Sequence, residues 1–352
     1  LTPNIDAVAK DGVLFARCFA TGTRTTRGME ALTLSIPPTP GRSIIHRDGN
    51  DGLFSLGSVL RDRGYDTAFF YGGYSYFDNM QQFFSSNGYR VVDRNSVAKD
   101  DVTFATAWGA CDEDLYRWTV READRIHDEG RPFHFFVMTT SNHRPYTYPD
   151  GRIDIPSGTG REGAVKYSDF AIGEFFKAAR TRPWFDSTIF VIVADHTASS
   201  AGKDELEIKR YRVPLIIYAP GLVESGQVLT QCSQIDVPPT ILGLLGMSYD
   251  SVFFGRDIFR MRPKEGRAWV GNYQKLGQLR LREAVVLRPD GTESFYGCDL
   301  WAEGLHRVDD VPPKLVDDTV AGYQAAYLLF SKGLLKEDVV RNGVPQRADS
   351  AW

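Results

Sequence analysis

The chain has 352 residues, of which 42% are hydrophobic and 24% charged, a composition typical of a folded protein with room for one large α/β domain or for two domains. Its 41 basic and 45 acidic side chains give a net charge of −4, so we expect no broad nucleic-acid-binding surface and no nucleic-acid partner. The longest apolar runs, 133–140 and 187–194, have the length of buried strands and are too short for transmembrane helices.

The chain opens with a predicted amphipathic helix, for which Thr2 is the expected N-cap and Pro3 the first helical residue. Apolar and amphipathic segments then alternate, which predicts an α/β fold with a mostly parallel central sheet and helices on both faces. The predicted strands are 12–20, 65–73, 89–93, 133–140, 187–194 and 211–221. The predicted helices are 27–36, 53–64, 76–88, 112–130, 163–180 and 236–246.

The pattern changes at about residue 265. Residues 281–299 have the alternation of a β-hairpin, with Pro289, Asp290 and Gly291 as its turn, and a final helix is predicted over 317–334. We therefore expect a main domain over residues 1–264 and a small antiparallel subdomain with a terminal helix over residues 265–352.

The four cysteines are far apart in the sequence and form no Cys-x-x-Cys motif, which excludes a zinc ribbon or a thioredoxin-like site. We expect most of them to be buried free thiols, with one or two disulfides at most. They are Cys18, Cys111, Cys232 and Cys298.

Polar residues that directly follow predicted strands are the candidates for a functional site, because ligands of open α/β sheets bind beyond the carboxyl ends of the strands. Asp195 and His196 follow the strand 187–194. A carboxylate oxygen beside an imidazole nitrogen suits a divalent metal ion, whereas the structural alternative is a hydrogen-bonded histidine beside an aspartate that caps a turn. Lys203, in the loop that follows, is either a group that stabilises developing charge or a solvated lysine.

The segment TGTRTTRGMEAL, residues 21–32, places hydroxyl groups and arginines at the start of a helix. Thr25 is either a helix cap or a nucleophile, and a threonine nucleophile needs activation by a base or a metal ion. Arg24 and Arg27 are then candidates to neutralise a phosphoryl group, or else they are ordinary surface arginines.

A second polar loop follows the strand 133–140 and contains Asn142 and His143. His143 is either a solvated loop residue or a group that hydrogen-bonds a substrate oxygen or protonates a leaving group, because imidazole titrates near neutral pH. Asn142 is a candidate substrate contact beside it.

Five motifs occur in order over residues 2–260: TPNIDAVAKDGVLF, GTRTTRGMEAL, TTSNHRPY, VIVADH and SQIDVPPTILGLLG. Together they resemble the extracytoplasmic domains of lipoteichoic acid synthases and of the bacterial phosphoglycerol transferase that decorates periplasmic glucans. Both belong to the sulfatase and alkaline-phosphatase superfamily.

The resemblance implies that Thr25 is the nucleophile and carries a glycerophosphoryl group between two half-reactions. It also implies that Thr25, Asp195 and His196 bind one divalent ion, Mn²⁺ or Mg²⁺ before Ca²⁺ or Zn²⁺, and that His143 contacts the glycerophosphate. The implied donor is a phosphatidylglycerol-type lipid and the acceptor a glycan or another hydroxyl compound. The implied location is the periplasmic, or extracytoplasmic, face of the inner membrane, close to the membrane through an N-terminal anchor that this sequence does not include.

Three departures from the family leave alternatives open. The site reads T-T-R-G-M and not CxPxR or SxPxR, which argues against formylglycine-dependent sulfatase chemistry. Asp78 and Met80 stand where the synthases have a tryptophan and an arginine. The family's remaining metal ligand, a glutamate, would precede Leu1, and Glu30 is a possible substitute. The alternatives are therefore a phosphodiesterase, phosphatase or sulfatase-like hydrolase of soluble esters, and a non-catalytic binding module on the same fold.

Overall fold

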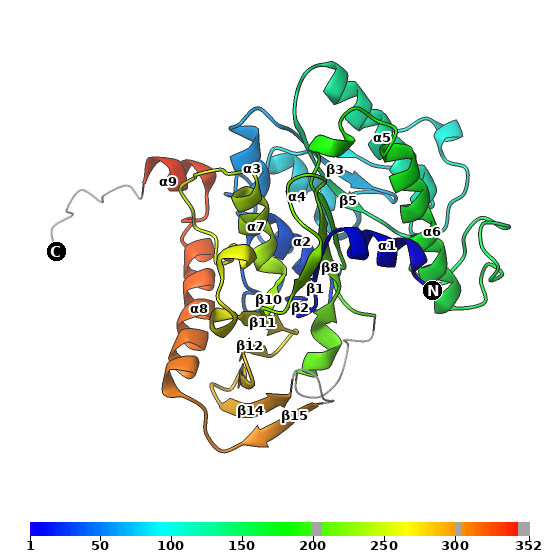
Figure 1. The fold of residues 1–352 in the computed structure, drawn as a ribbon. Helices are drawn as coiled ribbons and strands as arrows, with labels where there is room; N and C mark the ends of the chain where they lie inside the picture. The colour runs from blue at the N-terminus through cyan, green and yellow to red at the C-terminus, as the bar shows by residue number, and fades with distance from the viewer. Residues whose placement is uncertain (199–205, 300–303, 344–352) are drawn as a thin grey trace. The chain divides into compact units, whose positions relative to one another are not determined.

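The computed structural model of the chain describes residues 1–198, 206–299 and 304–343 (Figure 1). The chain divides into two compact units. The first unit consists of Leu1–Val13, Val59–Phe190 and Ile217–Gly226. The second unit consists of Leu14–Ser58, Val191–Ile216 and Gln227–Trp352. The predicted boundary at residue 264 remains a prediction, although all strands of the antiparallel sheet described below follow it.

The first unit contains a parallel three-stranded sheet in the order β4-β3-β5. The central strand β3 (Asp66–Tyr71) lies between β4 (Arg90–Val92) and β5 (Phe133–Met138). Parallel pairing of these apolar segments confirms the α/β prediction, because each crossover between them contains a helix.

Helices cover both faces of this sheet. Successive side chains of β3 point to opposite faces, and apolar side chains on both faces need to be covered. Ala68 and Phe70 point to one face, where they cluster with Trp118 of α5 (Asp112–Asp128). Phe69 points to the other face and stacks on Phe84 of α4 (Met80–Ser86), with ring centroids 3.7 Å apart. The outer helices are α6 (Arg161–Ala179), which packs on α5, and α1 (Pro3–Asp11), which packs on α6.

The first helix is capped differently from our prediction. Thr2 occupies the N-cap position of α1, but its hydroxyl donates to Asp6 and makes no cap hydrogen bond. The buried carboxylate of Asp169 on α6 instead accepts from the backbone N–H groups of Asn4 (3.1 Å) and Ile5 (2.7 Å). A carboxylate distant in sequence therefore satisfies the N-terminus of α1.

Two small sheets carry the strands that lead to the candidate site. The segment predicted as one strand, 12–20, forms two short strands, β1 (Val13–Phe15) and β2 (Cys18–Phe19). In one sheet β2 pairs in parallel with β10 (Cys232–Ser233) and antiparallel with β7 (Arg212–Val213). The other sheet has the order β6-β8-β1-β9. Its remaining strands are β6 (Phe190–Val193), β8 (Leu215–Tyr218) and β9 (Gly226–Val228).

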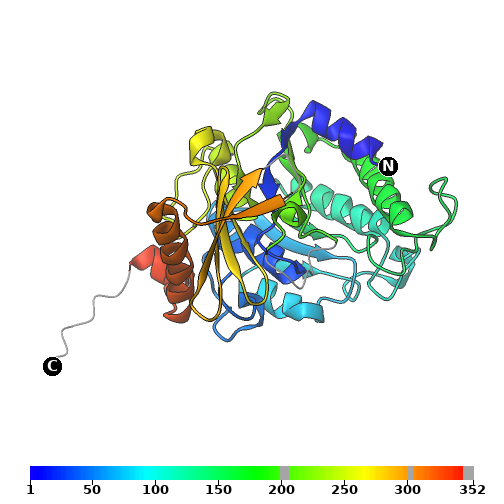
Figure 2. The ribbon, with the colours of Figure 1, turned by 90° about the horizontal axis from the view of Figure 1, so that it is seen from below.

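The C-terminal part forms the predicted antiparallel sheet, with five strands in sequential order. They are β11 (Arg267–Gly271), β12 (Leu276–Arg280), β13 (Glu283–Leu287), β14 (Glu293–Asp299) and β15 (Gly304–Val308). Helix α8 (Pro313–Ser331) packs against this sheet, as Figure 2 shows. The hydroxyl of Tyr323 fixes the contact, because it lies 2.9 Å from the Val270 carbonyl oxygen and 2.7 Å from that of Gly277.

The short helices complete the described elements: α2 (Thr25–Leu34), α3 (Leu56–Arg61), α7 (Val237–Leu244) and α9 (Glu337–Asn342). Within the described ranges, no helix combines the length and the apolar character that crossing a bilayer requires. Three cysteines, Cys18, Cys111 and Cys232, are buried free thiols, as predicted. Burial raises the pKa of the Cys111 thiol to about 11, so this thiol is protonated at neutral pH.

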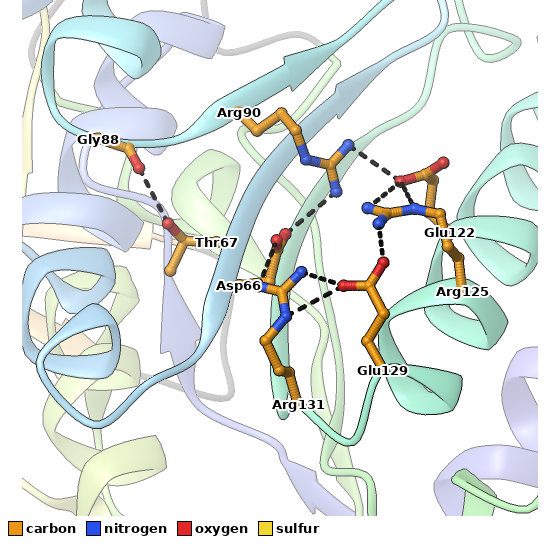
Figure 3. Close-up of polar contacts among 8 residues, drawn as sticks. All are labelled: Asp66, Thr67, Gly88, Arg90, Glu122, Arg125, Glu129 and Arg131. Atoms are coloured by element: carbon orange, nitrogen blue, oxygen red, sulfur yellow. Dashed lines mark hydrogen bonds and ion pairs between the residues drawn. The ribbon is translucent and has the colours of Figure 1, made fainter.

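A network of charged side chains lies at the amino ends of β3 and β4 (Figure 3). Asp66 and two glutamates alternate with three arginines, so that each carboxylate pairs with two guanidinium groups. The other members are Arg90, Glu122, Arg125, Glu129 and Arg131. Because this is the end of a parallel sheet opposite to the one where ligands bind, we assign the network to the exposed surface and not to a site.

Candidate functional site

Thr25 is the first residue of α2, and the structure does not support its alternative interpretation as a helix cap. The N-cap position belongs to Arg24, whose backbone is extended (φ −140°, ψ 148°). Thr25 is half-buried in the first turn, where backbone N–H groups point out of the helix end. Its hydroxyl therefore lies at a helix terminus that favours anions.

Asp195 and His196 follow β6 and share a local geometry suited to a cation. The Nδ1 atom of His196 lies 2.8 Å from the carbonyl oxygen of Thr197. Since a carbonyl only accepts, Nδ1 carries the proton, which leaves a lone pair on Nε2. That Nε2 atom lies 3.5 Å from Asp195 Oδ2, while Asp195 Oδ1 accepts from the His196 backbone N–H at 2.9 Å. The backbone contact holds the carboxylate so that Oδ2 and Nε2 face the same space.

The loop after β6 packs directly on the first turn of α2. Gly28 is one turn after Thr25, and a Cβ atom at Gly28 would lie only 2.5 Å from the carbonyl oxygen of Asp195 and 3.0 Å from its Cα. Only glycine permits this approach. The structure therefore brings the start of α2 and the Asp195–His196 pair together, within the second unit.

Gln234 fixes the same two segments and was not predicted as a site residue. It is fully buried between β10 and α7. Its Nε2 donates to the carbonyl oxygens of Ala194 and Asp195, both at 2.8 Å. Its Oε1 accepts from the backbone N–H of Thr21 at 2.9 Å. One side-chain amide thus joins the loop that leads to Thr25 to the end of β6. The local sequence, SQIDVPP, gives no signal for this role, because Ser233 and Asp236 beside the glutamine are polar as well.

Arg24 and Arg27, which we predicted as substrate contacts, have different environments. Arg24 is exposed, and its guanidinium lies over the ring of Tyr273 at 5.7 Å. Arg27 is buried, and its guanidinium donates to Glu30 (2.6 Å) and to the carbonyl oxygens of Thr39 (2.8 Å) and Gly41 (2.7 Å). These contacts favour a role for Arg27 in holding the loop after α2.

Glu30 is not placed as a metal ligand. Besides its contact with Arg27, its buried carboxylate accepts from the hydroxyl of Ser43 (2.6 Å) and from the backbone N–H of Ile44 (2.7 Å). A carboxylate with these three donors holds the 43–44 segment, so the expectation that Glu30 replaces the family's glutamate has no support from the geometry.

His143 and Asn142 are both exposed and belong to the first unit, in the loop after β5. The ring of His143 stacks on Trp108, with centroids 4.2 Å apart and an angle of 25° between the planes. The Nε1–H group of Trp108 also donates to the carbonyl oxygen of Arg144 at 2.6 Å. Trp108 therefore positions this loop, and no periodic pattern in the sequence marked it.

The start of the same loop is held by a buried carboxylate at the beginning of α5. Asp112 Oδ1 accepts from the backbone N–H groups of Thr140 and Ser141, both at 3.0 Å, and Asp112 Oδ2 accepts from the hydroxyl of Ser168 at 3.1 Å. Burial raises the pKa of Asp112, partly offset by these hydrogen bonds.

The remaining sequence expectations have the following outcomes. Lys203 lies outside the described residues. Met80 is the buried first residue of α4, and its apolar side chain supplies no positive charge in place of the arginine of the synthases. In the part of the chain that the structure describes, no group of three His, Cys, Asp or Glu side chains converges. Asp195, His196 and the Thr25 hydroxyl remain the expected metal donors, and one carboxylate, one imidazole and one alcohol form a set that fits a divalent ion.

Comparisons with known proteins support the resemblance found in the sequence. The chain is 26% identical over 253 residues to lipoteichoic acid synthase 2 of Bacillus subtilis, which covers 66% of this chain and 38% of that protein. It is 28% identical over 273 residues to phosphoglycerol transferase I of Xanthomonas axonopodis, which covers 73% of this chain and 39% of that protein. The chain thus spans well under half the length of these relatives.

A solved structure and a family model identify the fold and the family. A crystal structure of a Vibrio parahaemolyticus protein in the alkaline phosphatase superfamily has a TM-score of 0.90 and 33% identity, and covers 96% of this chain and 83% of that one. The model of the sulfatase family matches residues 1–247. The first unit and the site on α2 and β6 lie almost wholly within that match, and the chain belongs to the sulfatase family, within the alkaline phosphatase superfamily.

Proposed function

We propose that this chain is the catalytic part of a phosphoglycerol transferase, which moves glycerophosphate from a phosphatidylglycerol-type lipid to an acceptor hydroxyl. One observation carries the proposal: the backbone of Asp195 packs on Gly28, one turn after Thr25. This contact supports the proposal that a candidate nucleophile and a candidate metal-binding pair form one site. The names of the relatives, lipoteichoic acid synthase and phosphoglycerol transferase, supply the reaction class.

The proposed reaction has two steps. In the first, Thr25 Oγ attacks the phosphorus of the donor, an Oγ–P bond forms, the bond from phosphorus to diacylglycerol oxygen breaks, and the threonine proton ends on diacylglycerol. In the second, a hydroxyl of a glycan or another acceptor attacks the phosphothreonine, the Oγ–P bond breaks, and Thr25 regains a proton. If water is the acceptor, the same steps make a phosphodiesterase.

The side chains near Thr25 have separate proposed roles. In this proposal the N-terminus of α2 and the exposed guanidinium of Arg24 stabilise the negative charge of the phosphoryl group. Asp195, His196 and Thr25 would hold a divalent ion, for which we propose Mn²⁺ or Mg²⁺, with Ca²⁺ or Zn²⁺ as alternatives. Such an ion, when bound, lowers the pKa of a hydroxyl and offsets phosphoryl charge. His196 is prepared for this role because Thr197 keeps its proton on Nδ1.

Asn142, His143 and Lys203 remain proposed substrate contacts. A lipid donor implies work at a membrane, so we also propose that the chain acts at the extracytoplasmic face, as part of a longer protein with a membrane anchor. The relatives named above are the support for this location.

The test is the intact mass of the chain after incubation with phosphatidylglycerol and Mn²⁺ and an acid quench. We expect a glycerophosphoryl adduct that maps to Thr25 and is lost in Thr25→Ala. Thr23→Ala, which removes a half-buried threonine hydroxyl two residues earlier, is the matched control and should keep the adduct. An adduct on another residue, or release of diacylglycerol with Thr25→Ala as fast as with the parent, would refute the proposed nucleophile.

A further inference from the structure

The first unit carries a cluster of four aromatic side chains, three of them exposed and one, Trp108, half-buried, which we call the aromatic rim and define as Tyr74, Tyr76, Phe77 and Trp108. Tyr76 is 71% exposed, Phe77 43% and Tyr74 37%. The rings of Tyr74 and Tyr76 stack at 5.8 Å, and Phe77 meets Trp108 edge-on at 5.8 Å. The four rings form these two pairs, and Tyr74, Tyr76 and Phe77 still present much of their area to water.

A rigid base holds the aromatic rim in place. A Cβ atom at Gly73 would lie 2.3 Å from the carbonyl oxygen of Trp108, so the two segments of backbone are in direct contact. Ser75, which is buried, donates to Asp93 Oδ2 through both its backbone N–H (2.8 Å) and its hydroxyl (2.6 Å). The exposed rings are therefore mounted on fixed backbone. Exposure of apolar area in fixed positions is unfavourable unless another surface covers it.

The aromatic rim follows β3 and adjoins the loop that follows β5, so it lies at the carboxyl end of the parallel sheet. Its link to that loop is the stack of Trp108 on His143. His143 is the residue that we expect to contact the glycerophosphate. One member of the rim, Trp108, thus contacts one of the proposed substrate residues, within a single unit.

The charges beside the aromatic rim indicate what covers it. The guanidinium of Arg94 lies 5.2 Å from the centre of the Tyr74 ring. Arg144, which is exposed, follows His143 directly. Tyr and Trp rings together with arginines are the side chains that favour the headgroup region of a bilayer, and arginines are drawn to anionic lipids. Asp78 is an acidic group in the same segment, and it is only half-exposed.

We propose that the aromatic rim docks on the surface of an anionic phospholipid bilayer, with Tyr74, Tyr76 and Phe77 in the headgroup region and Arg94 and Arg144 toward lipid phosphates. The inference deepens the proposed function, on which it rests, because it would present a lipid donor beside His143. A sugar chain that stacks on the same rings is the competing occupant, and the experiment below separates the two.

The experiment measures co-sedimentation of the chain with vesicles, in a chelator and without turnover. One set of vesicles contains phosphatidylcholine alone, and the other contains phosphatidylcholine with phosphatidylglycerol. We expect tighter binding to the phosphatidylglycerol vesicles. Tyr76→Ser should weaken that binding about tenfold, since it removes one large interfacial ring. Tyr76→Trp should restore it. Tyr327→Ser, at a tyrosine 45% exposed on α8, is the matched control and should bind like the parent.

Three results would overturn the proposal: no binding to phosphatidylglycerol vesicles, equal binding by the parent and Tyr76→Ser, or equal weakening by Tyr327→Ser. Retention of the parent, but not of Tyr76→Ser, on an immobilised soluble glucan together with no vesicle binding would assign the rim to sugar. Because no step needs the Thr25 chemistry, this binding can fail while the phosphothreonine adduct forms, and the adduct can be absent while the binding occurs.

Discussion

Replacement of Gln234 by leucine tests whether one buried amide aligns the candidate site. The substitution keeps most of the side-chain volume and removes its hydrogen bonds to Thr21 N, Ala194 O and Asp195 O. Thr21 is itself buried, so its N–H loses its partner without access to water, whereas the loop after β6 is half-exposed. A buried polar group without a hydrogen-bond partner costs about 1 to 3 kcal/mol. We therefore expect Gln234→Leu to lower the free energy of unfolding by about 2 to 4 kcal/mol.

The assay combines urea unfolding with formation of the Thr25 adduct, measured at a urea-free condition where the variant is folded. The matched control is Gln278→Leu, since Gln278 of β12 is also buried and accepts from the hydroxyl of Thr319 on α8 (3.1 Å). We expect both variants to be destabilised and only Gln234→Leu to lose most of its adduct. Equal adduct formation by the two variants would refute the idea that Gln234 aligns the site, and unchanged stability would refute the energy estimate.

Three further predictions concern packing, pH and surface charge. Gly28→Ala places a methyl group 2.5 Å from Asp195 O and should cost about 1 to 3 kcal/mol of stability and slow adduct formation; a variant as active and as stable as the parent would contradict the close approach. Burial lowers the pKa of His134 from 6.5 to about 4. As the pH drops from about 6.5 toward 4, the unfolded chain therefore takes up a proton that the folded chain does not bind, and the free energy of unfolding falls. His134→Phe should flatten the dependence of the urea midpoint on pH in this range. An unchanged slope would contradict the assignment of this dependence to His134. Arg131→Gln removes one member of the network in Figure 3, and we expect the urea midpoint to stay close to that of the parent, because exposed ion pairs contribute little to stability; a clear fall in the midpoint would show the network to be structural.

Local patterns in the sequence were sufficient for much of the fold. The apolar run AFF, 68–70, lies in the segment 65–73 that we predicted as a strand, and Phe69 and Phe70 do face different helices. The Pro-Asp-Gly turn also lies where predicted, with Gly291 at φ +79° between β13 and β14. These features depend on neighbours in the chain, and so a single sequence reveals them.

Features that depend on distant partners could not be predicted. Thr2 had the right residue type for a cap, but the backbone N–H of Asn4 donates to the carboxylate of Asp169, 165 residues away. Arg27 and Glu30 were plausible chemical groups until their contacts with each other and with the 39–44 segment were known. Gln234 carries no local signal, because its role exists only once three segments meet.

The hydrogen bond from Thr21 to Gln234 joins residues 213 positions apart, and the amide's other partners lie 39 and 40 positions before it. During synthesis the threonine loop therefore leaves the ribosome long before the residue that aligns it. Until the SQID segment has been made and has folded, the loop that leads to Thr25 lacks the hydrogen bond from Thr21 N–H to the Gln234 side chain. The order of synthesis therefore limits the order of folding: the candidate site can be aligned only after residue 234 of the 352 has been made.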